Sequence, residues 1–409
     1  MNGANPEFLD TATQIGAAIC RDALWCGDRC NWLGDQQTTR GRRSVMQHAA
    51  LGPDLYSGTM GIALFLAELS TATKDALFAR TALAAARQSL SVFERILPPR
   101  QPGLYSGRTG VAHGLVRVGE VLQHDEFLSQ GLGLFDQLAE AAPEVDGTDV
   151  ISGKAGIISA IAGVERRHPR PKRLAWALRL GTSLLEAAIQ DGDGWSWATV
   201  KRPGEPRRHG FAHGAVGIAS ALGELYEITG EQRFAEGARA AAKFAAGRLK
   251  TFGGGSTEDS KNEAGAGPLF SERAVGWCHG PAGICEALRR LQEVLGDEWL
   301  KQETEIALEI LAEHLRGFLA TGRGNFCLCH GIAGNAEPLI IAGGLLGRTD
   351  LVKLVADVGR KGIGLYGGNR LPWPCGFTSE GFTPGLMLGL AGIGQFYLRL
   401  GQTADRGIS

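Results

Sequence analysis

The sequence lacks the features that would place it in several large classes of protein. No stretch reaches the about 18 consecutive apolar residues that a membrane-spanning helix needs, so no integral membrane segment is expected. The 42 basic and 43 acidic side chains give a formal net charge of −1, which offers no electrostatic reason to expect a nucleic acid or a membrane surface as partner. Strand-like alternation is also scarce, and this favours a helical protein.

Cysteine is sparse as well. Eight cysteines among 409 residues are too few for a disulfide-stabilised scaffold, and their clustering indicates a cytoplasmic protein with reduced thiols. The first eight residues contain neither the basic nor the apolar region of a signal peptide. Residues 1–19 are interpreted as an N-terminal extension, in part vector-derived, and are left out of the fold prediction. Residues 20–405 are predicted to form a single domain.

What the sequence has instead is a repeated motif. A Gly-x-x-Gly pair followed by an apolar run occurs seven times, and successive first glycines lie 49, 46, 61, 66, 51 and 58 residues apart. Repetition on this scale is typical of repeat architectures. The pairs are Gly58/Gly61, Gly107/Gly110, Gly153/Gly156, Gly214/Gly217, Gly280/Gly283, Gly331/Gly334 and Gly389/Gly392.

Amphipathic stretches between these pairs predict a second set of helices. They cover residues 74–97, 125–142, 172–190, 231–249, 298–319 and 350–366. We therefore expect an inner helix to begin at each Gly-x-x-Gly and an outer helix to follow it. An open solenoid needs polar caps at both ends, but the last unit, residues 386–394, is apolar. The prediction is an all-α fold, an α,α-toroid or double-layered helical barrel of about seven helical hairpins.

Two neighbouring units carry a Cys-His pair directly before the first glycine: Trp277-Cys278-His279-Gly280 and Cys327-Leu328-Cys329-His330-Gly331. Thiolate and imidazole are ligands that zinc favours, and equivalent positions of adjacent units can converge on one point. If Cys278, Cys329 and His330 bind the metal, its fourth position stays open, as in a catalytic site. If His279 binds too, the site is a closed structural one. Cys327 is an alternative to Cys329, and sequence geometry does not choose among these ligand sets.

The order of the motifs resembles that of the lanthionine synthetase C-like (LanC) family over roughly residues 20 to 400. The resemblance rests on both Cys-His-Gly triplets, on the closing segment 384–394, and on Asp149-x-x-x-Gly153-x-x-Gly156 and His213-Gly214-x-x-Gly217. It implies an α,α-toroid that holds one zinc ion per chain. It also implies the chemistry of lanthipeptide antibiotic biosynthesis, in which cysteine thiols of a dehydrated, ribosomally made precursor peptide add to dehydroalanine or dehydrobutyrine to form thioether rings.

The resemblance further implies roles for single residues. The metal ligands are Cys278, Cys329 and His330, and His279 is assigned to the surroundings of the metal or to proton transfer. His213 is the general acid/base, since imidazole titrates near neutral pH. Asp149 orients the proton carrier or the substrate. Arg273 stabilises the enolate, although it lies one residue away from the family's arginine position.

Three functions remain open from the sequence. The first is the peptide cyclase, the second is a related enzyme that adds glutathione to dehydroamino acids, and the third is a noncatalytic scaffold stabilised by zinc. A protein prenyltransferase β-subunit is disfavoured because its metal site usually includes a carboxylate. No dehydratase domain precedes the repeats in this sequence, so a cyclase is expected to depend on a separate dehydratase or on a dehydratase domain outside the given sequence. The polar loops 199–209 and 251–273 are interpreted either as solvated loops or as segments that contact the peptide.

Overall fold

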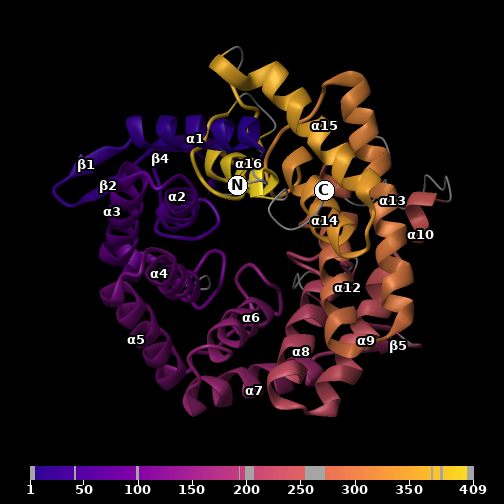
Figure 1. Ribbon diagram of the computed structural model, residues 1–409. Coiled ribbons are helices and arrows are strands. Elements are labelled where there is room, and N and C mark those ends of the chain that lie inside the picture. Colours follow the sequence, from indigo (N-terminus) through magenta and orange to yellow (C-terminus); the bar gives the residue numbers. More distant parts are fainter. Residues whose placement is uncertain are drawn as a thin grey trace.

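The computed structural model describes residues 5–40, 43–97, 101–192, 194–198, 207–253, 272–369, 372–377 and 381–402. Within these ranges, fourteen helices of at least 12 residues form two concentric rings (Figure 1). The inner ring consists of α2 (Thr59–Thr73), α4 (Arg108–Leu122), α6 (Lys154–Glu165), α8 (Ala215–Thr229), α12 (Pro281–Leu295), α14 (Ile332–Leu345) and α16 (Leu390–Gln402). The outer ring consists of α1 (Pro6–Arg21), α3 (Ala76–Val92), α5 (Asp125–Ala141), α7 (Pro171–Glu186), α9 (Gln232–Ala246), α13 (Glu298–Thr321) and α15 (Thr349–Tyr366). The predicted α,α-toroid is confirmed.

Short elements connect the helices. Three antiparallel hairpins, which the sequence analysis did not predict, pair β1 (Leu24–Cys26) with β2 (Arg29–Asn31), β3 (Leu33–Arg40) with β4 (Arg43–Ala50) and β5 (Ile189–Asp191) with β6 (Gly194–Ser196). The remaining pieces are α10 (Lys250–Gly253), α11 (Glu272–Val275) and the 3₁₀ turns η1 (Phe93–Arg95) and η3 (Gly367–Asn369). In the part of the chain that is described, no helix combines the length and the apolarity needed to cross a bilayer.

The repeated Gly-x-x-Gly marks a tight contact at the start of each inner helix. The second glycine of every pair lies against the carbonyl oxygen of the residue three positions before the first glycine. A Cβ atom on Gly110, for example, would lie 1.8 Å from the carbonyl oxygen of Leu104, and in the other six units the same distance is 1.8–2.4 Å. These glycines are therefore needed for the close approach of two backbones.

The seventh hairpin is formed by the two ends of the chain. Helix α1 packs against α16 and buries Phe8 and Ile15, and the N–H of Asn5 donates to the carbonyl of Gly401 at 3.2 Å. The segment 1–19, which the sequence analysis set aside as an extension, thus belongs to the toroid from Pro6 onward. The apolar residues of α1 have helical spacing, so the signal was present in the part that was left out.

Candidate active site

The loops that precede the inner helices are joined into a closed belt by main-chain hydrogen bonds. Each belt residue stands two positions before the first glycine of its unit: Tyr56, Tyr105, Ile151, Ala212, Cys278, Cys329 and Met387. Six hydrogen bonds of 2.9–3.2 Å run from the N–H of one belt residue to the carbonyl of the next. In the third unit the donor is Val150, one residue earlier, at 3.1 Å from the carbonyl of Ala212. The two cysteines predicted as ligands are direct neighbours in this belt, with the N–H of Cys278 3.2 Å from the carbonyl of Cys329.

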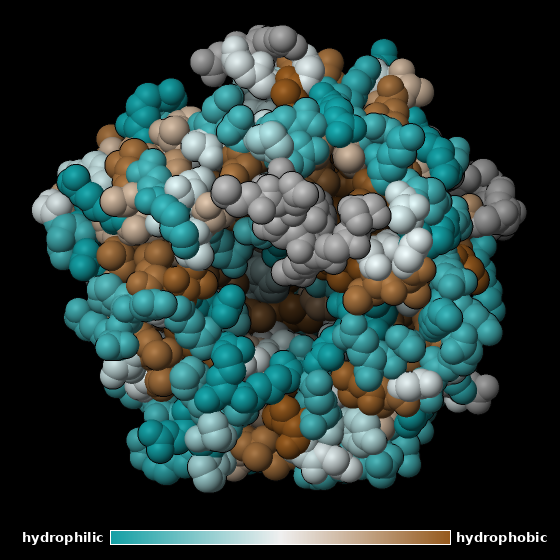
Figure 2. Space-filling view, in the orientation of Figure 1, coloured by the Kyte–Doolittle hydropathy of each residue, from teal (hydrophilic) through white to brown (hydrophobic). Residues whose placement is uncertain are grey.

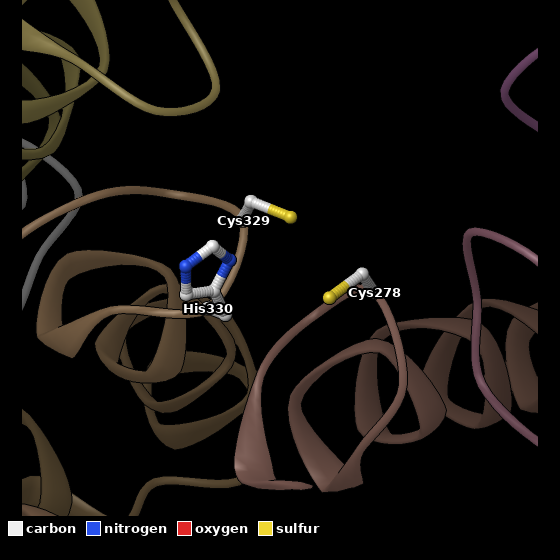
Figure 3. A group of neighbouring side chains, drawn as sticks. All are labelled: Cys278, Cys329 and His330. Atoms are coloured by element: carbon white, nitrogen blue, oxygen red, sulfur yellow. The ribbon is translucent and has the colours of Figure 1, made fainter. Parts of the chain in front are cut away.

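Cys278, Cys329 and His330 converge in a group that can hold a metal ion. One ligand atom from each residue lies within 4.8 Å of the others, and the three side chains point toward one another (Figure 3). Cys278 and Cys329 are 7% and 3% exposed. Cys327 is not part of the group. Its sulfur accepts a hydrogen bond from the N–H of His330 at 3.4 Å, which gives it a structural role in the turn.

Hydrogen bonding prepares the His330 imidazole to bind a metal. Its Nε2 lies 3.1 Å from the carbonyl oxygen of Gly376. A carbonyl only accepts, so Nε2 is the donor in this contact, and Nδ1 is the nitrogen that faces the two sulfurs and is left to coordinate a metal. In metal-binding histidines, a carbonyl that accepts from the nitrogen facing away from the metal fixes the tautomer and the orientation of the ring. The donor set of two sulfurs and one imidazole therefore fits zinc, and it leaves one of four tetrahedral positions open.

The charges within the group favour a cation. The hydrogen bond to Cys278 lowers the pKa of the Cys329 thiol well below its ordinary value, and His330 and Tyr56 act in the same direction against the effect of burial. Burial lowers the pKa of His330, but the sulfurs of Cys327 and Cys329 raise it to about 10. The His330 shift arises because negative charge on sulfur stabilises positive charge beside it, whereas the Cys329 shift comes first from the hydrogen bond with Cys278.

Asp149 and His213 form a hydrogen-bonded pair near the start of the inner helices α6 and α8. Asp149 Oδ2 lies 2.8 Å from His213 Nδ1, and Oδ1 accepts from the N–H groups of Ser152 at 2.9 Å and Gly153 at 3.0 Å. Burial raises the pKa of Asp149, but the bonds from His213 and from the two N–H groups outweigh it and hold that pKa below its ordinary value. The carboxylate therefore stays ionised and accepts the Nδ1 hydrogen. This leaves Nε2 of a side chain that is 34% exposed for proton transfer.

His279 links this pair to the metal group. His213, His279 and His330 stand at the same position in three successive units, one residue before the first glycine. The rings of His213 and His279 are stacked, with centroids 5.9 Å apart and an angle of 29° between their planes. His279 follows Cys278 directly but does not belong to the group of potential metal ligands. The structure thus places Asp149, His213 and His279 in one connected set beside the metal group.

Two sequence expectations fall on parts that the structure does not describe. Arg273 belongs to α11, but its side chain lies outside the described residues. Most of the loops 199–209 and 251–273 also lies outside them.

Tyr56 is a site residue that the sequence analysis did not find. Its hydroxyl donates a hydrogen bond to the sulfur of Cys329 at 2.9 Å. Burial raises the pKa of Tyr56 well above its ordinary value, and so does the negative sulfur of Cys329. No motif marks this tyrosine, and the only hint in the sequence is its position in the first unit, equivalent to that of the two cysteines.

The inner helices surround a central cavity of about 290 Å³. Figure 2 shows the surface hollowed at the centre of the ring. The lining includes Glu286, whose pKa is raised by burial, and the ion pair between Arg399 and Glu337. The bore of the toroid therefore carries charged side chains among apolar ones, whereas the space between its two helix layers is filled by the apolar core.

Comparisons with known proteins agree with this architecture. Nisin cyclase superposes with a TM-score of 0.56 at 18% sequence identity, over 85% of this chain and 87% of that one. Two other structures are less similar. An α-1,6-mannanase from Salegentibacter sp. HEL1_6 has a TM-score of 0.47 and 10% sequence identity over 97% of this chain and 98% of that one. A sugar epimerase from a ruminal bacterium has a TM-score of 0.46 and 15% sequence identity over 99% of each chain. A search of curated proteins finds no match. A sequence profile described as "Lanthionine synthetase C-like protein" matches residues 49–406, and the chain therefore belongs to the LanC-like family.

Proposed function

We propose that this chain is a zinc-dependent lanthionine synthetase. It adds cysteine thiolates of a dehydrated precursor peptide to dehydroalanine or dehydrobutyrine of the same peptide, and so closes lanthionine and methyllanthionine rings. The observation that carries the proposal is the convergence of Cys278, Cys329 and His330 beside the Asp149–His213 pair in a LanC-like toroid. The likeness to nisin cyclase supports a peptide as the class of substrate. A separate dehydratase would supply the alkenes.

Cys278, Cys329 and His330 would hold one zinc ion. A free cysteine is mostly thiol at neutral pH, because its pKa is about 8.5. When bound, zinc supplies a thiolate by lowering the pKa of a cysteine thiol at its open position. The hydrogen bond from His330 to the Gly376 carbonyl would orient the imidazole toward the metal.

The remaining chemistry is a proton transfer. When a thiolate adds to the β-carbon of a dehydroamino acid, the electron pair of the alkene moves to an enolate, and the α-carbon then takes a proton. His213 is the donor in this proposal, because Asp149 fixes its Nδ1–H and leaves Nε2 to exchange protons. His279, stacked on the same ring, is a relay or a second carrier. Arg273 remains the proposed partner of the enolate.

The proposal is tested with the full chain, zinc and dehydrated peptides that contain cysteine. Cyclisation leaves the peptide mass unchanged, so free thiols are counted by alkylation and mass spectrometry. We expect thiols to be consumed with the wild-type protein and to persist in a matched peptide with alanine at each dehydroamino acid. Thiols that persist in the dehydrated peptide would contradict the cyclase. Addition of glutathione to a cysteine-free dehydrated peptide, without cyclisation, would instead assign the glutathione-adding activity.

A further inference from the structure

Tyr56 reaches the metal group through a contact between distant parts of the chain. Its hydroxyl donates a hydrogen bond to the Cys329 sulfur at 2.9 Å, although the two residues are 273 positions apart in sequence. Cys329 is 3% exposed, so bulk water does not compete effectively for this sulfur. In such surroundings a hydrogen bond is electrostatically stronger than it is in water.

The fold holds the Tyr56 hydroxyl in place before any ligand arrives. The carbonyl of Tyr56 accepts from the N–H of Met387 at 2.9 Å, and the carbonyl of Met387 accepts from the N–H of Cys329 at 2.9 Å. The two ends of the side-chain contact are therefore anchored to the same segment of the belt. The Tyr56 ring also packs edge-on against Tyr105, with centroids 6.3 Å apart and an angle of 80° between the planes.

In the proposed reaction, the hydrogen bond from Tyr56 would distinguish the Cys329 sulfur from the sulfur of the substrate. Two protein thiolates and one substrate thiolate carry three negative charges, which exceed the two positive charges of a zinc ion. All three sulfurs would lie close to an electrophilic alkene, but only the substrate sulfur forms the product. A hydroxyl that donates to one sulfur withdraws electron density from it and lowers its nucleophilicity.

We propose that Tyr56 is a positioning residue of the metal centre, whose hydrogen bond orients the Cys329 sulfur and makes it a poorer nucleophile than the substrate sulfur. The second part of this inference rests on the proposed function. Without the hydrogen bond, the Cys329 sulfur forms a bond to the β-carbon of a dehydroamino acid. The alkene electron pair becomes an enolate that takes a proton from water. The product is a stable thioether between the protein and the peptide.

The orientation is tested by spectroscopy on the full chain loaded with Co²⁺. A hydrogen bond lowers the energy of the sulfur lone pairs, so Tyr56→Phe is expected to move the sulfur-to-cobalt charge-transfer band to lower energy. Tyr56→3-fluorotyrosine, a stronger donor, is expected to move it to higher energy. Tyr105→Phe is the matched control. It removes the hydroxyl of a half-buried tyrosine at the equivalent position of the next unit, and no hydrogen bond joins that hydroxyl to either cysteine within the described residues.

Nucleophilicity is tested with a small dehydroalanine ester that contains no cysteine. Adducts are mapped by peptide mass spectrometry on the zinc-loaded proteins. The rate of addition at Cys329 is expected to rise about tenfold in Tyr56→Phe, the change that one hydrogen bond to a charged acceptor supports, and to stay at the wild-type rate in Tyr105→Phe.

An unchanged band together with an unchanged rate at Cys329 would overturn the inference. Loss of cobalt binding in Tyr56→Phe alone, with the wild-type circular dichroism spectrum retained, would support the orienting role. Neither measurement requires ring closure. A wild-type protein that fails to cyclise peptides would therefore refute the proposed function without deciding the role of Tyr56.

Discussion

At the scale of single residues, the proposed mechanism assigns metal binding and proton transfer to two separate groups of side chains. Cys278, Cys329 and His330 form the metal group, whereas the ionised Asp149 holds His213 in one tautomer. A proton carrier outside the metal group can be changed without removing a ligand. The two roles can therefore be separated by substitution.

His213→Asn is expected to keep the fold and the zinc content while lowering the cyclisation rate by about 100-fold or more, the usual contribution of a general acid/base. Rates come from thiol counting, and zinc from elemental analysis. His124→Asn is a matched control, because His124 caps the outer helix α5, where asparagine can also accept from the N–H of Phe127, and lies outside the proposed site. A His213→Asn protein that retains zinc and cyclises at the wild-type rate would remove His213 from the mechanism. His279 would then be the next candidate.

Some of these residues could be predicted from the sequence, and others could not. The Cys-His pairs mark their own positions, and the family resemblance added Asp149 and His213, but no local pattern shows that Asp149 and His213 touch across 64 residues. Tyr56 was missed for the same reason, since its role arises from a contact with a distant unit. The resemblance favoured Cys329 over Cys327 as a ligand, and the structure brings the Cys329 sulfur into the group with Cys278 and His330 while the Cys327 sulfur accepts from the N–H of His330.

At the scale of elements, the Gly-x-x-Gly pair predicted where each inner helix begins. Its physical basis is the contact between the second glycine and a carbonyl oxygen, which repeats in all seven units. The outer helices followed from their apolar periodicity. Helix α1 was missed because its segment was set aside, and the short hairpins were missed because strands of three residues, such as β1 and β2, show little alternation.

Gly110→Ala is expected to lower the free energy of unfolding by about 2 kcal/mol, because the added methyl group would meet the carbonyl oxygen of Leu104. Gly163→Ala, in helix α6, has no atom within 4 Å of the new methyl group, and it is expected to raise the free energy of unfolding by up to about 1 kcal/mol. Urea denaturation of both variants measures the difference. Equal stability of the two would contradict the account of the motif.

At the scale of the whole molecule, consecutive units bring the metal group together, and ring closure adds Tyr56 of the first unit to it. The belt makes Cys278 of one unit and Cys329 of the next adjacent, and α1 closes the ring by packing on α16. The apolar final unit predicted closure, but the helix that completes it comes from the opposite end of the chain. The central claim is that the two units together hold a zinc ion with an open position for the sulfur of a substrate.

X-ray absorption at the zinc edge tests this claim most directly. For the zinc-loaded full chain we expect two sulfur ligands, one imidazole and one light ligand from outside the protein. A dehydrated peptide with cysteine should raise the count to three sulfurs, whereas the same peptide with serine in place of cysteine should leave two. A zinc ion with two sulfurs and two imidazoles that does not change when the cysteine peptide is added would contradict the claim, because His279 would then close the site and zinc would serve as a structural support.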